Sequence, residues 1–500
     1  MRSNVIHNYA AQFFLVASGL LTLPFLLERL GAELYAFVAI LFTIQSIFSI
    51  LDGGLSGALA REFALKTSVA NKGSSAKSLL VKAELIFIPL SAIGLAAVVV
   101  SSSYLSHNWL KLSSINYAEA RHYLIIIGAI SALRMLGGLY RSVLIGFEKQ
   151  RQLSHVNILL TAARYFFVLP ILYYFESSGY LYFSYQLAIT IIELIILKIY
   201  AANVVATKMH LTRQDTVPAD DFFNLFYKSA QIWFLTLIWV AATQIDKFIL
   251  SKIMPLEEFG YFSVVSALAS GLLMLGSPIT SAAMPKMSRY FREQSYGDCE
   301  KIYFQMTSLL SLVSVPVAFT LATAPEHALF IFTNSTLVAI KYSSILSFYS
   351  IGSLLLLLSG MTFLLQYSTG NLIANMRQNF LFLVFLVVAM LVMTSLENLR
   401  GAAYAWLFSN VLLIIYFIQP LNKLRGDGFH GRWLYTALIK PFIISGPSLA
   451  VVIYFAPLLS TKIESAAWLF FVYVILLMPI FVCFYWHKLK QFYHASKNTH

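Results

Sequence analysis

Ionisable side chains inside long apolar runs are the residues of this chain whose types and spacing could do chemistry. Arg134, Arg141 and Arg164 lie inside such runs, and each guanidinium can hold a carboxylate or a pyrophosphate through two hydrogen bonds. A helix would place Arg134 and Arg141 on one face. A charged group costs at least ~2.5–3.5 kcal/mol at the centre of a bilayer. These arginines therefore predict a wet, cationic site that binds an anionic substrate within the membrane.

Carboxylates are fewer in these runs. Asp52, Glu193 and Asp246 are candidates for coupling transport to an ion, and Asp52 and Lys247 are also candidates for contact with substrate. Three arginines against two carboxylates in the first part of the chain leave a positive excess. This excess favours an anionic substrate.

The alternative interpretation is that these charges pair with one another and hold helices together, as buried charges usually do. Lys247 would then lie at the membrane interface, where its long side chain reaches water. The expected pairs are Arg134 or Arg164 with Glu193 or Asp52, and Glu193 with Lys198. Asp52 could instead cap a helix or pair locally with Arg61.

Residue patterns typical of catalysis do not accompany these charges. The histidines lie in or beside expected loops without metal-ligand spacing, and Cys299 and Cys483 are far apart in the chain. The chain has no GxxxxGK[ST] nucleotide-binding motif. We therefore expect a protein that is not an enzyme and uses no cofactor or metal. Its energy would come from an ion gradient, the membrane potential or another chain.

The elements that must position the charges are transmembrane helices. The chain is 59% hydrophobic and only 11% charged, whereas soluble domains carry about 25% charged residues. The net charge of +13 indicates basic residues on the cytoplasmic side of a membrane rather than nucleic-acid binding. The composition therefore predicts an all-α polytopic membrane protein.

Apolar runs of roughly 20 residues predict about fourteen transmembrane helices. The first run is too long for a cleaved signal peptide and lacks a small-residue cleavage site. With the amino terminus inside, roughly three times as many Lys and Arg fall on the inside as on the outside, which predicts cytoplasmic termini. The expected spans are 8–29, 34–58, 79–103, 121–146, 155–176, 180–202, 228–250, 259–285, 302–324, 341–367, 380–396, 402–421, 436–459 and 466–487.

Residues 31–66 and residues 256–291 have a similar sequence pattern, in which Tyr35-Ala36-Phe37-Val38 aligns with Phe259-Gly260-Tyr261-Phe262. Such a repeat predicts two homologous six-helix lobes of the same orientation, related by a pseudo-two-fold axis along the membrane normal, with cargo bound between them. The predicted domains are an N-terminal lobe at 1–202, a cytoplasmic linker at 203–227, a C-terminal lobe at 228–421, and an extra helix pair with a tail at 422–500.

The first two expected spans resemble those of Wzx-type O-antigen flippases, in the polysaccharide-transporter branch of the MOP exporter superfamily. The residues that carry the resemblance are Leu30-Gly31, Tyr35, Gln45, Asp52-Gly53-Gly54-Leu55 and Arg61-Glu62, and later ATQIDKFILSK with Asp246, followed by Phe259-Gly260-Tyr261. Members of this family are commonly described with twelve spans, so about fourteen here is a departure. The arginines belong to no fixed family motif.

The resemblance implies a V-shaped, two-lobe transporter that works by alternating access. Its cargo would be an undecaprenyl-pyrophosphate-linked oligosaccharide, such as an O-antigen unit for lipopolysaccharide biosynthesis, moved to the outer leaflet of a bacterial inner membrane. It also implies a polysaccharide polymerase and a chain-length regulator as partners.

Other functions remain open from the sequence. A peptidoglycan lipid flippase fits the span number and the cationic residues. A drug/cation antiporter of the same superfamily would need a net-negative site. A membrane-embedded glycosyltransferase or polymerase would need larger outer loops than the apolar runs leave, and a structural scaffold would not need arginines at bilayer depth.

Overall fold

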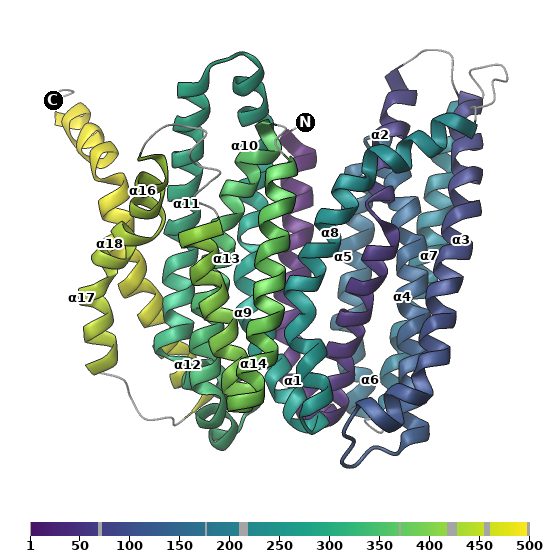
Figure 1. Cartoon of the computed structure of the whole chain (residues 1–500), viewed down its shortest axis with the longest axis horizontal. Coiled ribbons are helices and arrows are strands. Elements are labelled where there is room, and N and C mark those ends of the chain that lie inside the picture. The colour runs from purple at the N-terminus through teal and green to yellow at the C-terminus, as the bar shows by residue number, and fades with distance from the viewer. Residues whose placement is uncertain are drawn as a thin grey trace. The chain divides into compact units, whose positions relative to one another are not determined.

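The computed structural model describes residues 2–68, 73–175, 178–209, 219–369, 372–417, 428–454 and 461–497 (Figure 1). Regular structure in these ranges is helical, apart from one isolated bridge between Lys111 and Pro255. The prediction of an all-α polytopic membrane protein is confirmed. The chain divides into two compact units, Met1–Ser263 and Val264–His500.

The first unit is built around α4, which packs against α2, α3 and α7. Aromatic rings fill the contact between α1, α4 and α7, where the Tyr123 ring lies 5.4 Å from those of both Phe37 and Phe183. The elements of this unit are α1 (Arg2–Asp52), α2 (Leu55–Ser68), α3 (Gly73–Tyr104) with the π-helical turn η1 (Leu105–Trp109), α4 (Tyr117–Gly146), α5 (Gln150–Tyr165), α6 (Val168–Tyr174), α7 (Gly179–Met209), α8 (Ala219–Ile253) and the start of α9 (Leu256–Met274).

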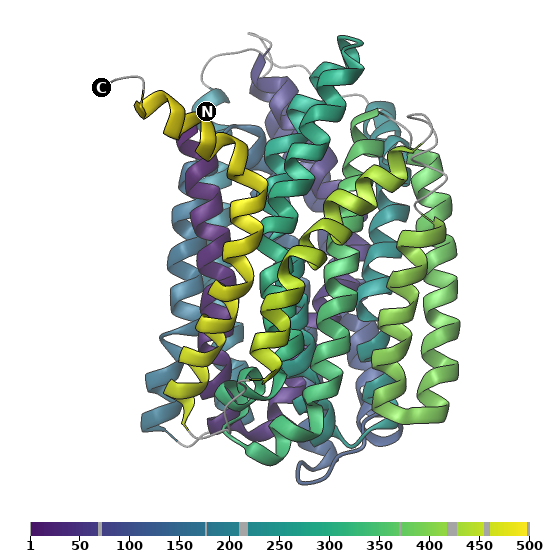
Figure 2. The same cartoon turned by 90° about the vertical axis from the view of Figure 1, so that its left-hand side faces the viewer.

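The second unit is built around α11 and α13, which pack on each other. Its last two long helices, α17 and α18, run side by side (Figures 1 and 2). The elements are α10 (Gly276–Arg292), α11 (Tyr296–Thr323), α12 (Pro325–Thr333), α13 (Thr336–Thr369), α14 (Leu372–Leu412) with the π-helical turn η2 (Leu413–Phe417), α16 (Phe429–Leu434), the π-helical turn η4 (Tyr435–Ile439), α17 (Lys440–Tyr454) and α18 (Lys462–Lys497).

Eleven helical segments within the described ranges are long and apolar enough to cross a membrane. Two of them contain non-helical backbone angles inside what is otherwise one long helix, at Gly31 (φ 78°) and at Asn398 (φ 49°). In Figure 1 the purple ribbon of α1 runs down from the N-terminus and back up toward α2, so the chain reverses at Gly31. The segments interrupted at Gly31 and at Asn398 therefore each correspond to two of the expected spans. The total of about fourteen stays a prediction.

Several expected boundaries are corrected. The expected span 34–58 stops at Asp52, because Gly53 and Gly54 adopt positive φ angles before α2 begins. The expected span 155–176 is broken between α5 and α6. The predicted linker at 203–227 is helical at both ends, since α7 reaches Met209 and α8 starts at Ala219. Residues 210–218 of that linker lie outside the described residues.

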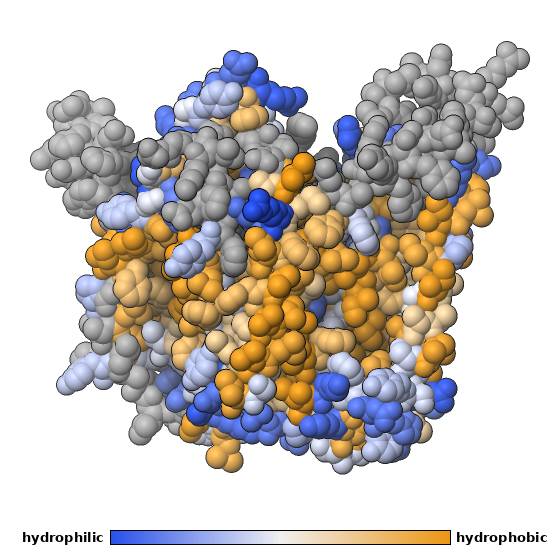
Figure 3. Space-filling model, viewed as in Figure 1, coloured by the Kyte–Doolittle hydropathy of each residue, from blue (hydrophilic) through white to orange (hydrophobic). Residues whose placement is uncertain are grey.

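Side chains on the outside of the helices also fit a protein that crosses a membrane. On the face in Figure 3, hydrophobic residues cover the middle of the helices and hydrophilic residues gather at their ends. Large apolar side chains of α3, including Leu85, Ile93 and Val100, are exposed. Such a surface suits hydrocarbon rather than water, as expected of a multi-pass membrane protein.

Candidate functional site

A break in the fourth membrane-crossing segment positions Arg164. Pro170 has no backbone N–H to donate to a carbonyl one turn earlier, and the helix is interrupted between Tyr165 and Val168. Two carbonyl groups just before the break are bound by α7 instead. The Tyr185 hydroxyl donates to the Ala163 carbonyl oxygen at 2.6 Å, and Gln186 Nε2 donates to the Arg164 carbonyl oxygen at 3.2 Å. The break and α7 together fix the point from which the Arg164 side chain extends.

Glu193 lies two helical turns beyond Gln186, near the middle of the apolar part of α7. Its Oε1 accepts a hydrogen bond from Arg141 on α4, and its Oε2 accepts one from Arg164 Nη2 at 2.5 Å. The Glu193 side chain is only 5% exposed, against 11% for Arg164 and 33% for Arg141. One buried carboxylate thus joins three helices through two guanidinium groups.

Arg134 completes this group, which we call the arginine cluster (Arg134, Arg141, Arg164 and Glu193). It lies close enough to the other three to interact electrostatically with each. Among the described residues Arg134 forms no ion pair, and the Nε atoms of all three arginines are buried without a hydrogen-bond partner. The cluster therefore has two uncompensated positive charges and unused donors, which is what binding of an anion requires.

The structure corrects one expected pair and adds a carboxylate that the sequence analysis missed. Lys198 does not pair with Glu193, and its Nζ lies 3.9 Å from Glu84 on α3. Glu84 also accepts a hydrogen bond of 2.7 Å from the Tyr140 hydroxyl. Its position inside the expected span 79–103 was the signal that could have identified it. The expected Arg164–Glu193 pair is present, and Arg141 joins it.

Asp52 is used as a helix cap. Its Oδ1 accepts hydrogen bonds from the Ser56 hydroxyl at 2.6 Å and from the Ser56 backbone N–H at 3.3 Å. The described side chains show no ion pair between Asp52 and Arg61. The expected pairings of Asp52 with an arginine are therefore wrong. The expected local cap is present, since Asp52 is the last residue of α1 and caps the start of α2 across the glycine turn.

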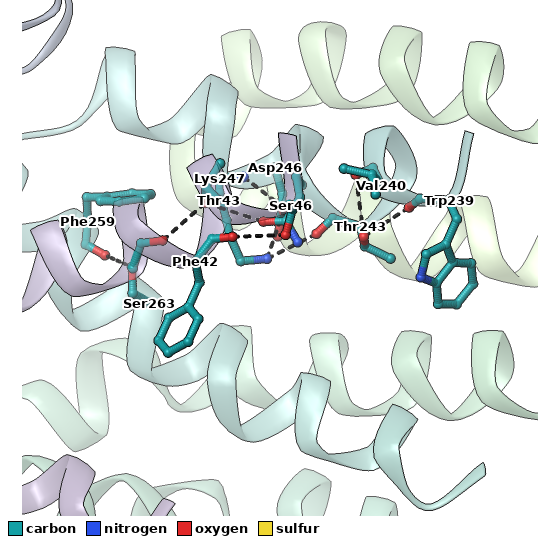
Figure 4. Close-up of polar contacts among 12 residues, drawn as sticks. Phe42, Thr43, Ser46, Trp239, Val240, Thr243, Asp246, Lys247, Phe259 and Ser263 are labelled. Atoms are coloured by element: carbon teal, nitrogen blue, oxygen red, sulfur yellow. Dashed lines mark hydrogen bonds and ion pairs between the residues drawn. The ribbon is translucent and has the colours of Figure 1, made fainter. Parts of the chain in front are cut away.

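Asp246 and Lys247 lie in a second polar group, between α1 and α8 (Figure 4). The Asp246 side chain is 3% exposed, and the Lys247 Nζ lies 3.5 Å from its Oδ1 and donates to the Thr243 carbonyl oxygen at 3.1 Å. Thr43 of α1 donates to Gln244 Oε1 at 3.3 Å, which ties the two helices together. This group balances its own charge, unlike the arginine cluster.

Glu33, a further carboxylate that the sequence analysis missed, binds a loop at one end of the first unit. It follows the break at Gly31. Its Oε1 accepts from the Ser113 backbone N–H at 2.6 Å, and its Oε2 accepts from the Ser114 N–H at 2.9 Å and from the Ser114 hydroxyl. The carboxylate thus fixes the loop that follows η1 against α1.

The same loop holds the turn between α8 and α9. The Lys111 carbonyl oxygen accepts from the Leu256 N–H at 2.9 Å, and the Lys111 Nζ donates to the Ile253 carbonyl oxygen at 2.7 Å. Trp109 Nε1 donates to Ser251 Oγ at 3.0 Å. We call these contacts, together with those of Glu33, the loop bracket. Within the described ranges no three His, Cys, Asp or Glu side chains group in a way that could hold a metal ion.

Comparison with known families shows what kind of protein carries these features. Residues 1–291 match the model of a family described as polysaccharide biosynthesis protein. The chain belongs to this family. The matched part includes the whole arginine cluster and the loop bracket, and it confirms the family resemblance seen in the sequence. No curated protein matches the chain.

Solved structures show the same fold at low sequence identity. A structure of the lipid II flippase MurJ in an inward closed conformation has a TM-score of 0.67 and 13% identity, and covers 97% of this chain and 100% of its own. A multidrug resistance MATE family transporter of the MOP superfamily, in an inward-facing conformation, has a TM-score of 0.65 and 14% identity over 85% of this chain and 99% of its own. A Vibrio cholerae MATE transporter in a bent form has a TM-score of 0.52 and 14% identity over 86% and 99%.

Proposed function

We propose that this protein is a flippase that carries an undecaprenyl-pyrophosphate-linked oligosaccharide, such as an O-antigen or related repeat unit, across the membrane. The observation that carries the proposal is the arginine cluster, with two uncompensated positive charges on helices long and apolar enough to cross a membrane. A diphosphate loses its hydration when it crosses a bilayer, and guanidinium groups at that depth offset the loss. Membership of a polysaccharide biosynthesis family supports a sugar-bearing cargo.

In this proposal, transport proceeds by alternating access in a bacterial inner membrane, with both termini in the cytoplasm. Arg134, Arg141 and Arg164 contact the diphosphate, and the coupling ion acts at Glu193 or Asp246. A polymerase and a chain-length regulator would use the product on the far side. The lipid tail would stay in the bilayer while the charged group passes the cluster.

Complementation tests the proposal. Cells that lack their own O-antigen flippase receive the wild-type chain, Arg164→Ala or Arg121→Ala at matched membrane levels, and surface polysaccharide is scored. Arg121 is the matched control because it lies on α4 with an exposed side chain and is outside the cluster. We expect surface polymer with wild type and Arg121→Ala, and loss with Arg164→Ala. Equal rescue by all three would refute the role of the cluster.

A peptidoglycan lipid flippase is the second candidate. The similarity to MurJ covers 97% of this chain, including the last helices that a twelve-span transporter would not need. Rescue of cells depleted of their peptidoglycan lipid flippase, with no rescue of O-antigen export, would favour this cargo. A drug/cation antiporter is disfavoured, because the excess charge of the cluster repels cations.

A further inference from the structure

Both oxygens of the Glu193 carboxylate are occupied, each by a guanidinium from a different helix. This is the arrangement that a phosphate group with two oxygens would also take. Glu193 therefore fills the place where the proposed function requires the anionic group of the cargo to bind. In the empty transporter this anion offsets the cost of placing the Arg141 and Arg164 guanidinium groups in an apolar surrounding.

The cluster can accept more negative charge than Glu193 supplies. Three guanidinium groups and one carboxylate leave two positive charges, and three buried Nε donors have no partner. A diphosphate that joins a lipid to a sugar carries one negative charge on each phosphate. The charge of such a diphosphate equals the excess of the cluster, so the loaded site would be neutral with Glu193 still ionised.

We propose that Glu193 is a built-in competitor of the cargo. It occupies Arg141 and Arg164 in the empty protein, yields them to the diphosphate when cargo binds, and takes them back when cargo leaves. Arg134 is the cation to which the displaced carboxylate turns, since it lies within electrostatic reach and has no ion pair among the described residues. This inference rests on the proposed function and deepens it.

The exchange between Glu193 and the diphosphate sets both the selectivity of the site and the release of the cargo. A singly charged phosphate does not compensate the cluster once it has displaced Glu193, whereas a diphosphate does. A site without Glu193 would bind the diphosphate more tightly but would lack the anion that drives it off. Tight binding would then slow each transport cycle, because affinity gained in the bound state raises the barrier to release.

Glu193→Gln in the full chain, reconstituted in nanodiscs, tests the exchange with two probes in which a geranylgeranyl chain is joined to glucose. The diphosphate probe has a diphosphate linkage with two negative charges, and the monophosphate probe has a single phosphate linkage with one. We expect Glu193→Gln to lower the Kd for the diphosphate by roughly ten-fold, to reduce the preference over monophosphate, and to lower polysaccharide export in cells. Glu193→Asp keeps the charge and should retain the wild-type preference. Glu84→Gln is the matched control, because Glu84 is a carboxylate of the same unit that contacts Tyr140 and Lys198 instead of the cluster.

Stability measurements keep the test decisive if Glu193→Gln is poorly folded. Losing the carboxylate leaves two guanidinium groups unpaired, so the variant should unfold at a lower temperature, and added diphosphate should restore more stability to it than to wild type. Binding by wild type with weaker binding by Glu193→Gln would overturn the competitor role and leave the proposed function intact. Absence of diphosphate binding by wild type would overturn both.

Discussion

Gly260→Ala tests whether the close approach of α9 to the α1 break is required for folding. Gly260 is buried, and a Cβ built on it would lie 1.9 Å from the Ala32 carbonyl oxygen and 2.7 Å from the Ala32 carbonyl carbon. Both atoms belong to backbone next to Gly31, where the chain reverses. No side-chain rotation can relieve this clash, so one backbone segment must move.

The distance by which the backbone must move indicates how much the substitution destabilises the fold. Carbon and oxygen approach to roughly 3.3 Å in close backbone contacts, so α9 and the α1 break would have to separate by more than an ångström. Overpacking of this kind costs about 1–3 kcal/mol. The cost should fall at the upper end, because the loop bracket holds the α8–α9 turn through Lys111 and the chain after η1 through Glu33.

The assay is thermal or denaturant unfolding of the purified chain in detergent, with Gly57→Ala as control. Gly57 lies in α2 with nothing within 4 Å of a built Cβ. Alanine there should stabilise the helix by up to about 1 kcal/mol, because glycine is the weaker helix former. A Gly260→Ala protein as stable as wild type, beside a Gly57→Ala protein that behaves as expected, would refute the packing argument.

Three further substitutions test single contacts by the same unfolding assay. Glu33→Gln turns an amide donor toward one of the loop N–H groups and should cost about 1–3 kcal/mol. The control is the exposed Glu28→Gln in the same helix, which should change stability by less than about 0.5 kcal/mol. Tyr185→Phe leaves the Ala163 carbonyl unpaired at the α5–α6 break and should cost about 0.5–1.5 kcal/mol, and it should lower export by misplacing Arg164. Trp233→Phe removes the 2.8 Å hydrogen bond to the Ile50 carbonyl oxygen and should cost at most about 1 kcal/mol, because Trp233 is partly exposed.

Helix content and the positions of unusual charges could be predicted from the sequence, because both depend on local composition. An apolar run must be helical to satisfy its backbone in lipid, and an arginine in such a run is visible without any knowledge of its neighbours. The family could be recognised too, since the short segments near Asp52 and Asp246 that carry the resemblance depend on local sequence alone, and both lie within the matched residues 1–291.

The partners of the charged side chains could not be predicted, because they depend on which helices pack against each other and through which faces. Lys198 follows Glu193 by five residues, which is roughly 140° around the helix axis. It therefore points toward Glu84 on α3 while Glu193 meets the arginines of α4 and α5. Glu33 shows the same limit, since its partners are backbone N–H groups of Ser113 and Ser114, which have no signature in side-chain composition.

Charge balance separates the candidate site residues into groups with different physical roles. The Asp52 carboxylate accepts a hydrogen bond from the hydroxyl of Ser56, four residues later in the chain. Lys247 forms an ion pair with the residue before it, Asp246. A substrate anion would have to break that neighbouring ion pair to gain Lys247, and the pair involves an Asp246 side chain that is only 3% exposed, so breaking it is costly. The arginine cluster differs, since its excess positive charge and its Nε donors without a hydrogen-bond partner are present before any cargo arrives, and Arg134 can take up the carboxylate that the cargo displaces. The proposed anion site therefore lies on α4, α5 and α7, and α1 packs against α4 and α5.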